Sequence, residues 1–156
     1  MKQKPYLLVS RCLLGEACRY DGKSVPVKEV MALSQYATLI SVCPESDGGM
    51  PTPRIPSERQ GARVINQAGE DTTAFFQKGA ELACLVAKEK QISFAVLKEK
   101  SPSCGTKQIY DGSFTGIKIP GEGMTAEALR RVGVVLYSEE DFKEGIPAPL
   151  KKYLGI

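Results

Sequence analysis

Histidine is absent from this chain of 156 residues. Its absence excludes Ser-His-Asp and Cys-His catalysis, zinc sites with imidazole ligands, Rieske centres and acid–base chemistry by histidine. Proton transfer must therefore use carboxylates, lysine, tyrosine, cysteine or hydroxyl groups. Tryptophan is also absent, so any stacking surface must come from tyrosine or phenylalanine.

The sequence also lacks a strong charge bias and a long apolar segment. Its 21 basic and 18 acidic residues are interspersed, and the net charge of +3 is too small for a nucleic-acid footprint. No apolar run is long enough to span a bilayer, and the short run after the basic N-terminus does not fit a signal peptide. We therefore expect a cytoplasmic monomer or weak homo-oligomer with a small-molecule partner and no membrane partner; nucleic acid is disfavoured.

Short apolar runs and helical patterns alternate along the chain. Runs typical of buried strands lie at residues 6–10, 38–42, 92–97 and 134–137. Apolar residues at helical spacing predict helices near residues 26–33, 72–90 and 125–131. This alternation indicates an α/β fold with a parallel sheet, and the length suits one domain over residues 1–156.

Capping and turn-forming residues mark the boundaries of these elements. Asp71 and Thr125 precede helical patterns and are predicted to be their N-caps. Asp111-Gly112 predicts the turn of a small hairpin within residues 108–115. Residues 43–61 contain four prolines and three glycines, which predicts a long functional loop without a core pattern of its own.

Three of the five cysteines lie at or beyond the ends of predicted strands. Cys12 lies two residues past its apolar run, Cys43 directly follows the second run, and Cys104 lies in the loop after the third run. Because the carboxyl ends of parallel strands line the ligand crevice of an open sheet, these positions predict a site with three thiolates. An odd number of cysteines in a reducing compartment argues against a disulfide framework.

The other two cysteines invite simpler interpretations. Cys84 lies in the apolar stripe of the 72–90 helix, where a free cysteine behaves as a small hydrophobe. Cys18 follows Cys12 by six residues in a polar loop. It is either a fourth ligand or a bystander, and we favour the bystander.

The spacing of the three strand-end cysteines bears on what they bind. Structural zinc normally has four ligands and a close Cys-x₂-Cys pair, and redox dithiols also use a close pair. This sequence contains no such close pair of cysteines. An iron–sulfur cluster accepts widely spaced cysteines. Three cysteines on a cluster of four irons would leave one iron without a protein thiolate, and this Lewis-acidic iron would prefer a soft sulfur ligand.

Two polar residues accompany the cysteines. Glu45 follows Cys43 by two residues, and Ser101 precedes Cys104 by three. A carboxyl group and a hydroxyl facing the open iron would be candidates for acid–base chemistry and hydrogen bonding. On spacing alone, a solvated carboxylate and a turn residue before Pro102 remain the simpler interpretations.

Five blocks of sequence, in order, resemble the bacterial thiouracil desulfidase family, which was long catalogued as a domain of unknown function. They are CLLGEACRYDGKS (12–24), CPESDGGMPTPRIPSER (43–59), LKEKSPSCG (97–105), YDGSFTG (110–116) and GEGMTAEALRRVGVVLYSEEDF (121–142). The resemblance runs over nearly the whole chain. It implies a single-domain, Rossmann-like, three-layer α/β fold with the site at the carboxyl ends of a mostly parallel sheet.

The resemblance also implies a cofactor and a reaction. The family's oxygen-sensitive 4Fe–4S cluster would be bound by Cys12, Cys43 and Cys104, with Glu45 and Ser101 as catalytic residues and Cys18 optional. The implied reaction removes sulfur from 2-thiouracil or a related thiolated pyrimidine, giving uracil and sulfide, with the substrate sulfur binding the open iron. Two alternatives stay open: a cluster-free persulfide sulfurtransferase using Cys104, and a metal-stabilised binding module without enzymatic activity.

Overall fold

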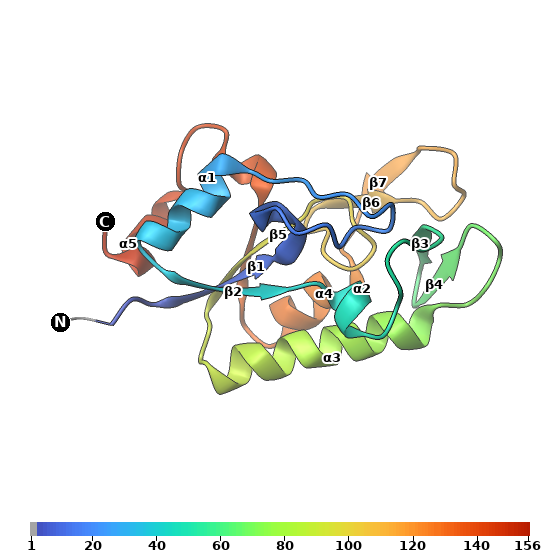
Figure 1. Ribbon diagram of the computed structural model, residues 1–156, viewed down its shortest axis with the longest axis horizontal. Coiled ribbons are helices and arrows are strands. Elements are labelled where there is room, and N and C mark those ends of the chain that lie inside the picture. Colours follow the sequence, from blue (N-terminus) through green and yellow to red (C-terminus); the bar gives the residue numbers. More distant parts are fainter. Residues whose placement is uncertain (1–2) are drawn as a thin grey trace.

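The computed structural model describes residues 3–156, which are built around a four-stranded sheet (Figure 1). The strand order is β2 (Thr38–Val42), β1 (Tyr6–Ser10), β5 (Phe94–Leu97) and β8 (Val135–Ser138), and each pairing is parallel. Ser10 lies opposite Val42, and Val9 lies opposite Val96. The predicted α/β fold with a mostly parallel sheet is confirmed, and β1 and β2 have the predicted boundaries.

Helices cover both faces of the sheet. One face carries α3 (Thr73–Glu89) and α4 (Met124–Arg131); the other carries α1 (Lys28–Met31), the 3₁₀ helix η2 (Ala32–Gln35) and α5 (Ala148–Leu154). Alternate residues of β1 enter the two cores, since Leu8 packs with α3 and α4 while Leu7 and Val9 pack with α1 and α5. The result is a three-layer arrangement. Within residues 3–156, no helix has both the length and the apolar character needed to cross a membrane.

The chain leaves two neighbouring strands toward opposite faces. The 3₁₀ turn η1 (Arg11–Leu14) and α1 follow β1 on one face, whereas α4 follows β5 on the other. This reversal makes a topological switch point, where ligands of open α/β sheets bind beyond the carboxyl ends of the strands. Ser10 Oγ accepts a hydrogen bond from Lys98 N at 2.9 Å and ties the two strand ends together there.

Two small hairpins lie beyond the carboxyl ends of the sheet (Figure 1). One pairs β3 (Ser57–Gln60) with β4 (Arg63–Asn66), and the other pairs β6 (Gln108–Tyr110) with β7 (Lys118–Pro120). Both pairings are antiparallel, and neither hairpin joins the central sheet. They add an irregular wall to the end of the molecule where the predicted site lies.

The structure corrects two expectations about this region. Residues 43–61 are not a featureless loop, because they contain β3 and the single-turn helix α2 (Pro44–Asp47). The second hairpin is wider than predicted: Asp111-Gly112 begins a loop over residues 111–117 and does not close a two-residue turn. Both errors share a cause, since these segments are ordered by contacts with distant residues.

The start of α4 also differs from expectation. Gly123, not Thr125, is its N-cap, and the first amides of the helix donate to the carbonyls of the preceding cysteine loop. Met124 N bonds to Pro102 O at 2.9 Å, and Thr125 N bonds to Ser103 O at 2.8 Å. Loop carbonyls thus replace the predicted side-chain cap.

At α3, Asp71 precedes the N-cap position by one residue, yet its Oδ1 accepts a hydrogen bond from Thr73 N at 2.9 Å.

The short helix α2 is held against α3 by a close approach of backbones. A Cβ added to Gly79 on α3 would lie 2.0 Å from the carbonyl oxygen of Pro44, and one added to Gly48 would lie 2.2 Å from the carbonyl oxygen of Phe75. Only glycine fits at such contacts. Since α2 directly follows Cys43, this contact fixes where β2 delivers its cysteine.

We expect Gly79→Ala to destabilise the protein although alanine favours helices. Helix propensity alone would stabilise the variant by about 1 kcal/mol, but displacing α2 is an overpacking cost of roughly 1–3 kcal/mol. Urea unfolding should show a net loss, and reaction with a thiol reagent should show greater exposure of Cys43. Lys78→Ala, at the exposed neighbouring position, is the control; a Gly79→Ala protein as stable as that control would contradict the prediction.

Candidate active site

A cavity of about 370 Å³ opens at the carboxyl ends of the parallel strands. All five predicted site residues line it, together with one that the sequence analysis had set aside: Cys12, Cys43, Glu45, Ser101, Cys104 and Cys18. The lining also contains residues of the two hairpins and their loops, including Glu58, Tyr110 and Phe114. The sequence-based prediction of one shared site agrees with this arrangement, while the function of each residue remains a prediction.

Three separate strand ends supply the predicted thiols. Cys12 lies in η1 two residues after β1, Cys43 directly follows β2, and Cys104 lies in the loop after β5. Their exposed fractions are 8%, 9% and 4%, respectively. The parallel register places these ends side by side, so residues far apart in the sequence meet in one buried position.

Cys18 belongs to the same thiol group. Its exposed fraction is 8%, and its carbonyl oxygen lies 3.6 Å from the Cys43 sulfur, which donates to it. A hydrogen bond with the Cys12 thiol raises the pKa of Cys18 to about 11, with burial acting in the same direction and the Cys43 thiol opposing them. The structure therefore brings a fourth thiol into the cavity, which sequence spacing alone did not indicate.

Polar contacts fix the backbone at Cys43. Asp47 Oδ2 accepts a hydrogen bond from Cys43 N at 3.1 Å, and Arg11 Nη1 donates to Asp47 Oδ1 at the same distance. The Cys43 thiol donates to Ser46 Oγ at 3.4 Å. Its hydrogen bond with Cys18, and then burial, raise the pKa of Cys43 above the usual thiol value. This cysteine is thus held by its own helical turn as well as by its strand.

Cys104 is the least exposed of the four cysteines that line the cavity. Burial raises the pKa of Cys104 to about 12, although hydrogen bonds with the hydroxyls of Ser10 and Ser103 act in the opposite direction. Ser103 Oγ is 3.6 Å from the sulfur. Two hydroxyls thus accompany this thiol, one from the end of β1 and one from its own loop.

Glu45 faces the same group through Ser103. Its Oε2 accepts a hydrogen bond from Ser103 Oγ at 3.1 Å, and its Oε1 accepts one from Arg54 Nε at 3.1 Å. The Arg54 side chain is only 4% exposed and also donates to the Cys18 carbonyl at 3.0 Å. The sequence did not predict these contacts of Arg54 and Ser103, because no motif shows which partners a loop arginine or a second serine will meet.

Ser101 lines the cavity, but its hydroxyl also organises its own loop. Ser101 Oγ accepts hydrogen bonds from Ser103 N at 3.1 Å and Cys104 N at 3.0 Å, and it lies 2.9 Å from Ser103 Oγ. These contacts hold the backbone that carries Cys104. The predicted turn function and the predicted position in the site are therefore compatible.

A buried carboxylate, Glu99, gathers the base of this loop. Its Oε1 accepts hydrogen bonds from four backbone amides, and its Oε2 accepts one from Thr106 Oγ1 at 2.8 Å. Burial would raise the pKa of Glu99, but the hydrogen bonds from Lys107, Thr106 and their neighbours outweigh it and lower that pKa. Glu99 thus holds the segment between β5 and β6 in place through these hydrogen bonds.

Cys84 lies elsewhere. It is partly buried on α3, packs against the core beneath α3 and α4, and does not line the cavity. Burial raises the pKa of Cys84. The interpretation of Cys84 as an apolar packing residue fits this position.

With the geometry established, comparison with known proteins identifies the family. The family model described as 2-thiouracil desulfurase matches residues 7–141. The chain belongs to the 2-thiouracil desulfurase family. The resemblance noted from the five sequence blocks is confirmed. The cavity that Cys12, Cys43 and Cys104 line thus belongs to a member of an enzyme family.

Two relatives of this family member extend the comparison. A Bacillus subtilis (strain 168) protein described as uncharacterized protein YbbK is 38% identical over 148 residues, which are 88% of this chain and 98% of the relative. A solved 4Fe–4S-dependent thiouracil desulfidase, TudS (DUF523Vcz), is 46% identical with a TM-score of 0.85. That match covers 90% of this chain and 95% of TudS, so the fold and the enzyme class agree along almost the whole length.

We expect Glu99→Gln to destabilise the protein by about 2 kcal/mol at pH 7, the scale for hydrogen bonds to a charged group. Because the folded state lowers the pKa of Glu99, its stabilising effect is present above the unfolded pKa of about 4.3 and is lost as the pH falls through the folded value. Unfolding measured between pH 7 and 3 should show the difference from wild type shrinking. Glu144→Gln, at an exposed position, is the control; a pH-independent difference would contradict this assignment.

Proposed function

We propose that this family member is a 4Fe–4S-dependent desulfidase that removes sulfur from 2-thiouracil or a related thiolated pyrimidine, giving uracil or its analogue and sulfide. The observation that carries the proposal is the convergence of three buried strand-end thiols and a carboxyl group on one cavity. The 46% identity with TudS supports the choice of cofactor and substrate. The proposal includes a cytoplasmic location, where thiols stay reduced, and a monomer or weak homo-oligomer.

Cys12, Cys43 and Cys104 would bind the cluster. Thiolates are the usual ligands of iron–sulfur clusters, and each binds a different iron. Among residues 3–156, no group of three or more histidine, cysteine or acidic side chains is arranged to hold a single metal ion. The three thiols are nevertheless the ligand type that a cluster takes, and Cys18 is additional to the three proposed ligands.

When bound, the cluster would supply an iron without a protein thiolate, a Lewis acid with an affinity for the soft sulfur of a thiocarbonyl group. The residues around it would supply proton transfer and positioning. Glu45 would accept a proton from the attacking water at Oε2, the oxygen that now accepts from Ser103 Oγ. Ser101 would hydrogen-bond the substrate or this water, and Arg54 would keep the Glu45 carboxylate in place.

The overall change is a hydrolysis. Water supplies the oxygen that replaces sulfur on the ring carbon, and its two protons leave with sulfur as hydrogen sulfide. No electrons enter or leave, so neither a reductant nor a separate sulfur acceptor is needed. With histidine absent from the chain, a carboxylate is a chemically reasonable base for this step.

The two alternative functions have less support. A persulfide carrier needs an accessible thiol that can reach a partner, whereas Cys104 is 4% exposed at the base of the cavity. A metal-stabilised binding module without enzymatic activity is disfavoured because the chain belongs to an enzyme family. In its zinc form, such a module would also need four ligands around one ion, and the described residues contain no such group. A colourless preparation that stays active in air would nevertheless favour the sulfurtransferase over our proposal.

We expect single replacements of Cys12, Cys43 or Cys104 by alanine to abolish both cluster incorporation and turnover. Anaerobic purification, iron and sulfide analysis and visible absorption would measure the cluster, with about four irons and four sulfides per wild-type chain. Cys84→Ala and Cys18→Ala are the controls and should retain the cluster. An active Cys43→Ala protein with a complete cluster would make the three-ligand assignment wrong.

We expect Glu45→Gln to lower turnover about a hundredfold or more, the usual scale for losing general acid–base catalysis. Glutamine keeps the size of the side chain and an oxygen that can accept from Arg54 or Ser103, so the cluster content should stay at the wild-type level. The measurement is kcat for 2-thiouracil at equal cluster content. Near-normal turnover would show that Glu45 has only a structural function.

A further inference from the structure

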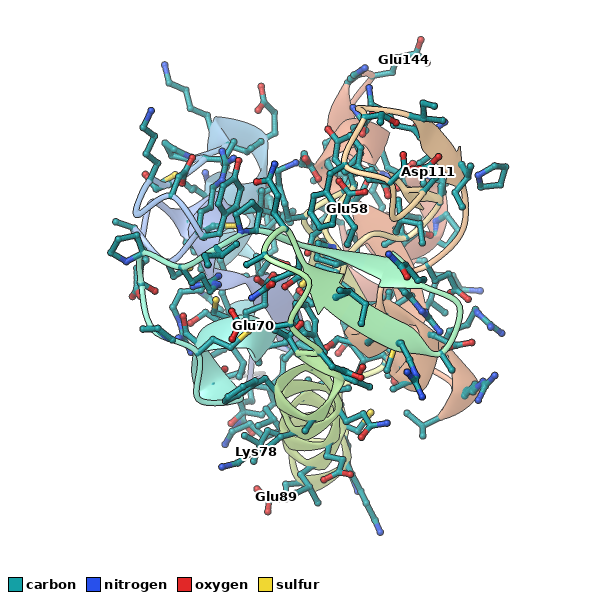
Figure 2. All side chains as sticks on the ribbon, turned by 90° about the vertical axis from the view of Figure 1, so that its right-hand side faces the viewer. Glu58, Glu70, Lys78, Glu89, Asp111 and Glu144 are labelled. Carbon is teal, nitrogen blue, oxygen red and sulfur yellow. The ribbon has the colours of Figure 1, made fainter. Side chains whose placement is uncertain are left out.

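Part of the cavity lining comes from the two hairpins beyond the sheet and forms a wall of its own. It comes from the two hairpins, which contribute Glu58 from β3, Tyr110 from β6 and Phe114 from the loop after β6. Figure 2 shows Glu58 at the junction between these hairpins. None of the proposed ligands or catalytic residues lies on this wall, so it is available to bind the part of a substrate that does not react.

Phe114 is held on this wall in an uncommon backbone conformation. Its φ is +59°, in the left-handed region that bulky residues rarely occupy. Its ring is partly buried and lines the cavity. Such conformations persist only where surrounding contacts impose them, and they cluster at ligand-binding positions.

The contacts that impose this conformation come from β3. Glu58 Oε1 accepts hydrogen bonds from Gly112 N at 2.9 Å and Phe114 N at 3.1 Å. Gln60 Nε2 donates to the Gly112 carbonyl at 2.9 Å. One hairpin thus clamps the loop of the other, and this clamp holds the backbone that carries the Phe114 ring.

The clamp leaves hydrogen-bonding capacity on Glu58. Both loop amides use Oε1, and within residues 3–156 no hydrogen bond reaches Oε2. Since Glu58 lines the cavity, this oxygen can accept from a ligand. The wall therefore offers an aromatic face beside a carboxylate acceptor, which suits a flat heterocycle with a ring N–H group.

We propose that Phe114 and Glu58 form the subsite for the pyrimidine ring, with the ring stacked on Phe114 and a ring N–H donating to Glu58 Oε2. The inference rests on the proposed function for its substrate class. A volume of about 370 Å³ is within the roughly 300–1,000 Å³ of small-molecule pockets.

Four variants test the stacking half of this subsite. Phe114→Gly removes the ring while relieving the positive φ, so the protein should be at least as stable as wild type. Phe114→Leu keeps an apolar side chain, and Phe114→Tyr keeps the ring. Phe75→Leu, on α3 and outside the cavity lining, is the control.

Steady-state kinetics of anaerobically reconstituted enzyme give the first measurement. Phe114→Gly and Phe114→Leu should raise KM for 2-thiouracil about tenfold, the scale of one base stacked on an aromatic ring, with kcat and cluster content nearly unchanged. Phe114→Tyr and Phe75→Leu should behave as wild type. A wild-type KM for Phe114→Gly would overturn the stacking assignment.

Glu58→Gln tests the acceptor. Glutamine can keep an oxygen for the two loop amides, but it places an amide donor where the ligand's N–H would meet Oε2. KM should rise about tenfold, while Glu70→Gln, outside the cavity lining, should have no effect. An unchanged KM for Glu58→Gln would overturn this assignment.

Binding of uracil and 2-thiouracil to the cluster-free protein, measured anaerobically by calorimetry, separates this subsite from the catalytic proposal. Wild-type binding that Phe114→Gly weakens, combined with no turnover by the loaded enzyme, would support the subsite and reject the desulfidase function. Turnover by wild type, combined with no effect of substitutions at Phe114 or Glu58 on binding or KM, would support the desulfidase function and reject the subsite.

Discussion

Hydrogen bonding between β1 and its two parallel neighbours determines where the cavity thiols lie. Ser10 is paired with Val42, and Val9 with Val96, so three strands end at one edge. A shift of one residue in either register would turn alternate side chains to the opposite face, and both faces are buried against helices. The cores on the two faces therefore fix the register, and the register fixes the thiols.

Beyond the strand ends, polar contacts take over from packing. Glu99 binds the amides of one loop, Asp47 binds the amide of Cys43, and Arg54 joins Glu45 to the Cys18 carbonyl. Each of these side chains is at least partly withdrawn from water, where charged hydrogen bonds are stronger. Loops without a hydrophobic core of their own thereby hold several cavity residues in fixed positions.

The sequence predicted the features that depend on local pattern, and it failed where distant contacts decide. Continuous apolar runs located β1 and β2, because burial on both faces leaves that signal in neighbouring residues. Thr125 was predicted to be the N-cap of α4, but the first amides of this helix donate to the carbonyls of Pro102 and Ser103 instead. Cys18 looked peripheral because its proximity to Cys12 and Cys43 depends on how an irregular loop folds. The clamp of Glu58 on the loop at Phe114 links residues 56 positions apart, which no local pattern can show.

The hydrogen bonds between α4 and the Cys104 loop also make the position of this loop depend on a later part of the chain. The carbonyls of Pro102 and Ser103 accept hydrogen bonds from amides of residues 124–126. A nascent chain that has emerged only as far as Cys104 already contains every cysteine of the protein, yet it lacks the helix that positions the last strand-end thiol. The loop that carries this thiol therefore takes its observed position only in a chain that includes residues of the C-terminal third.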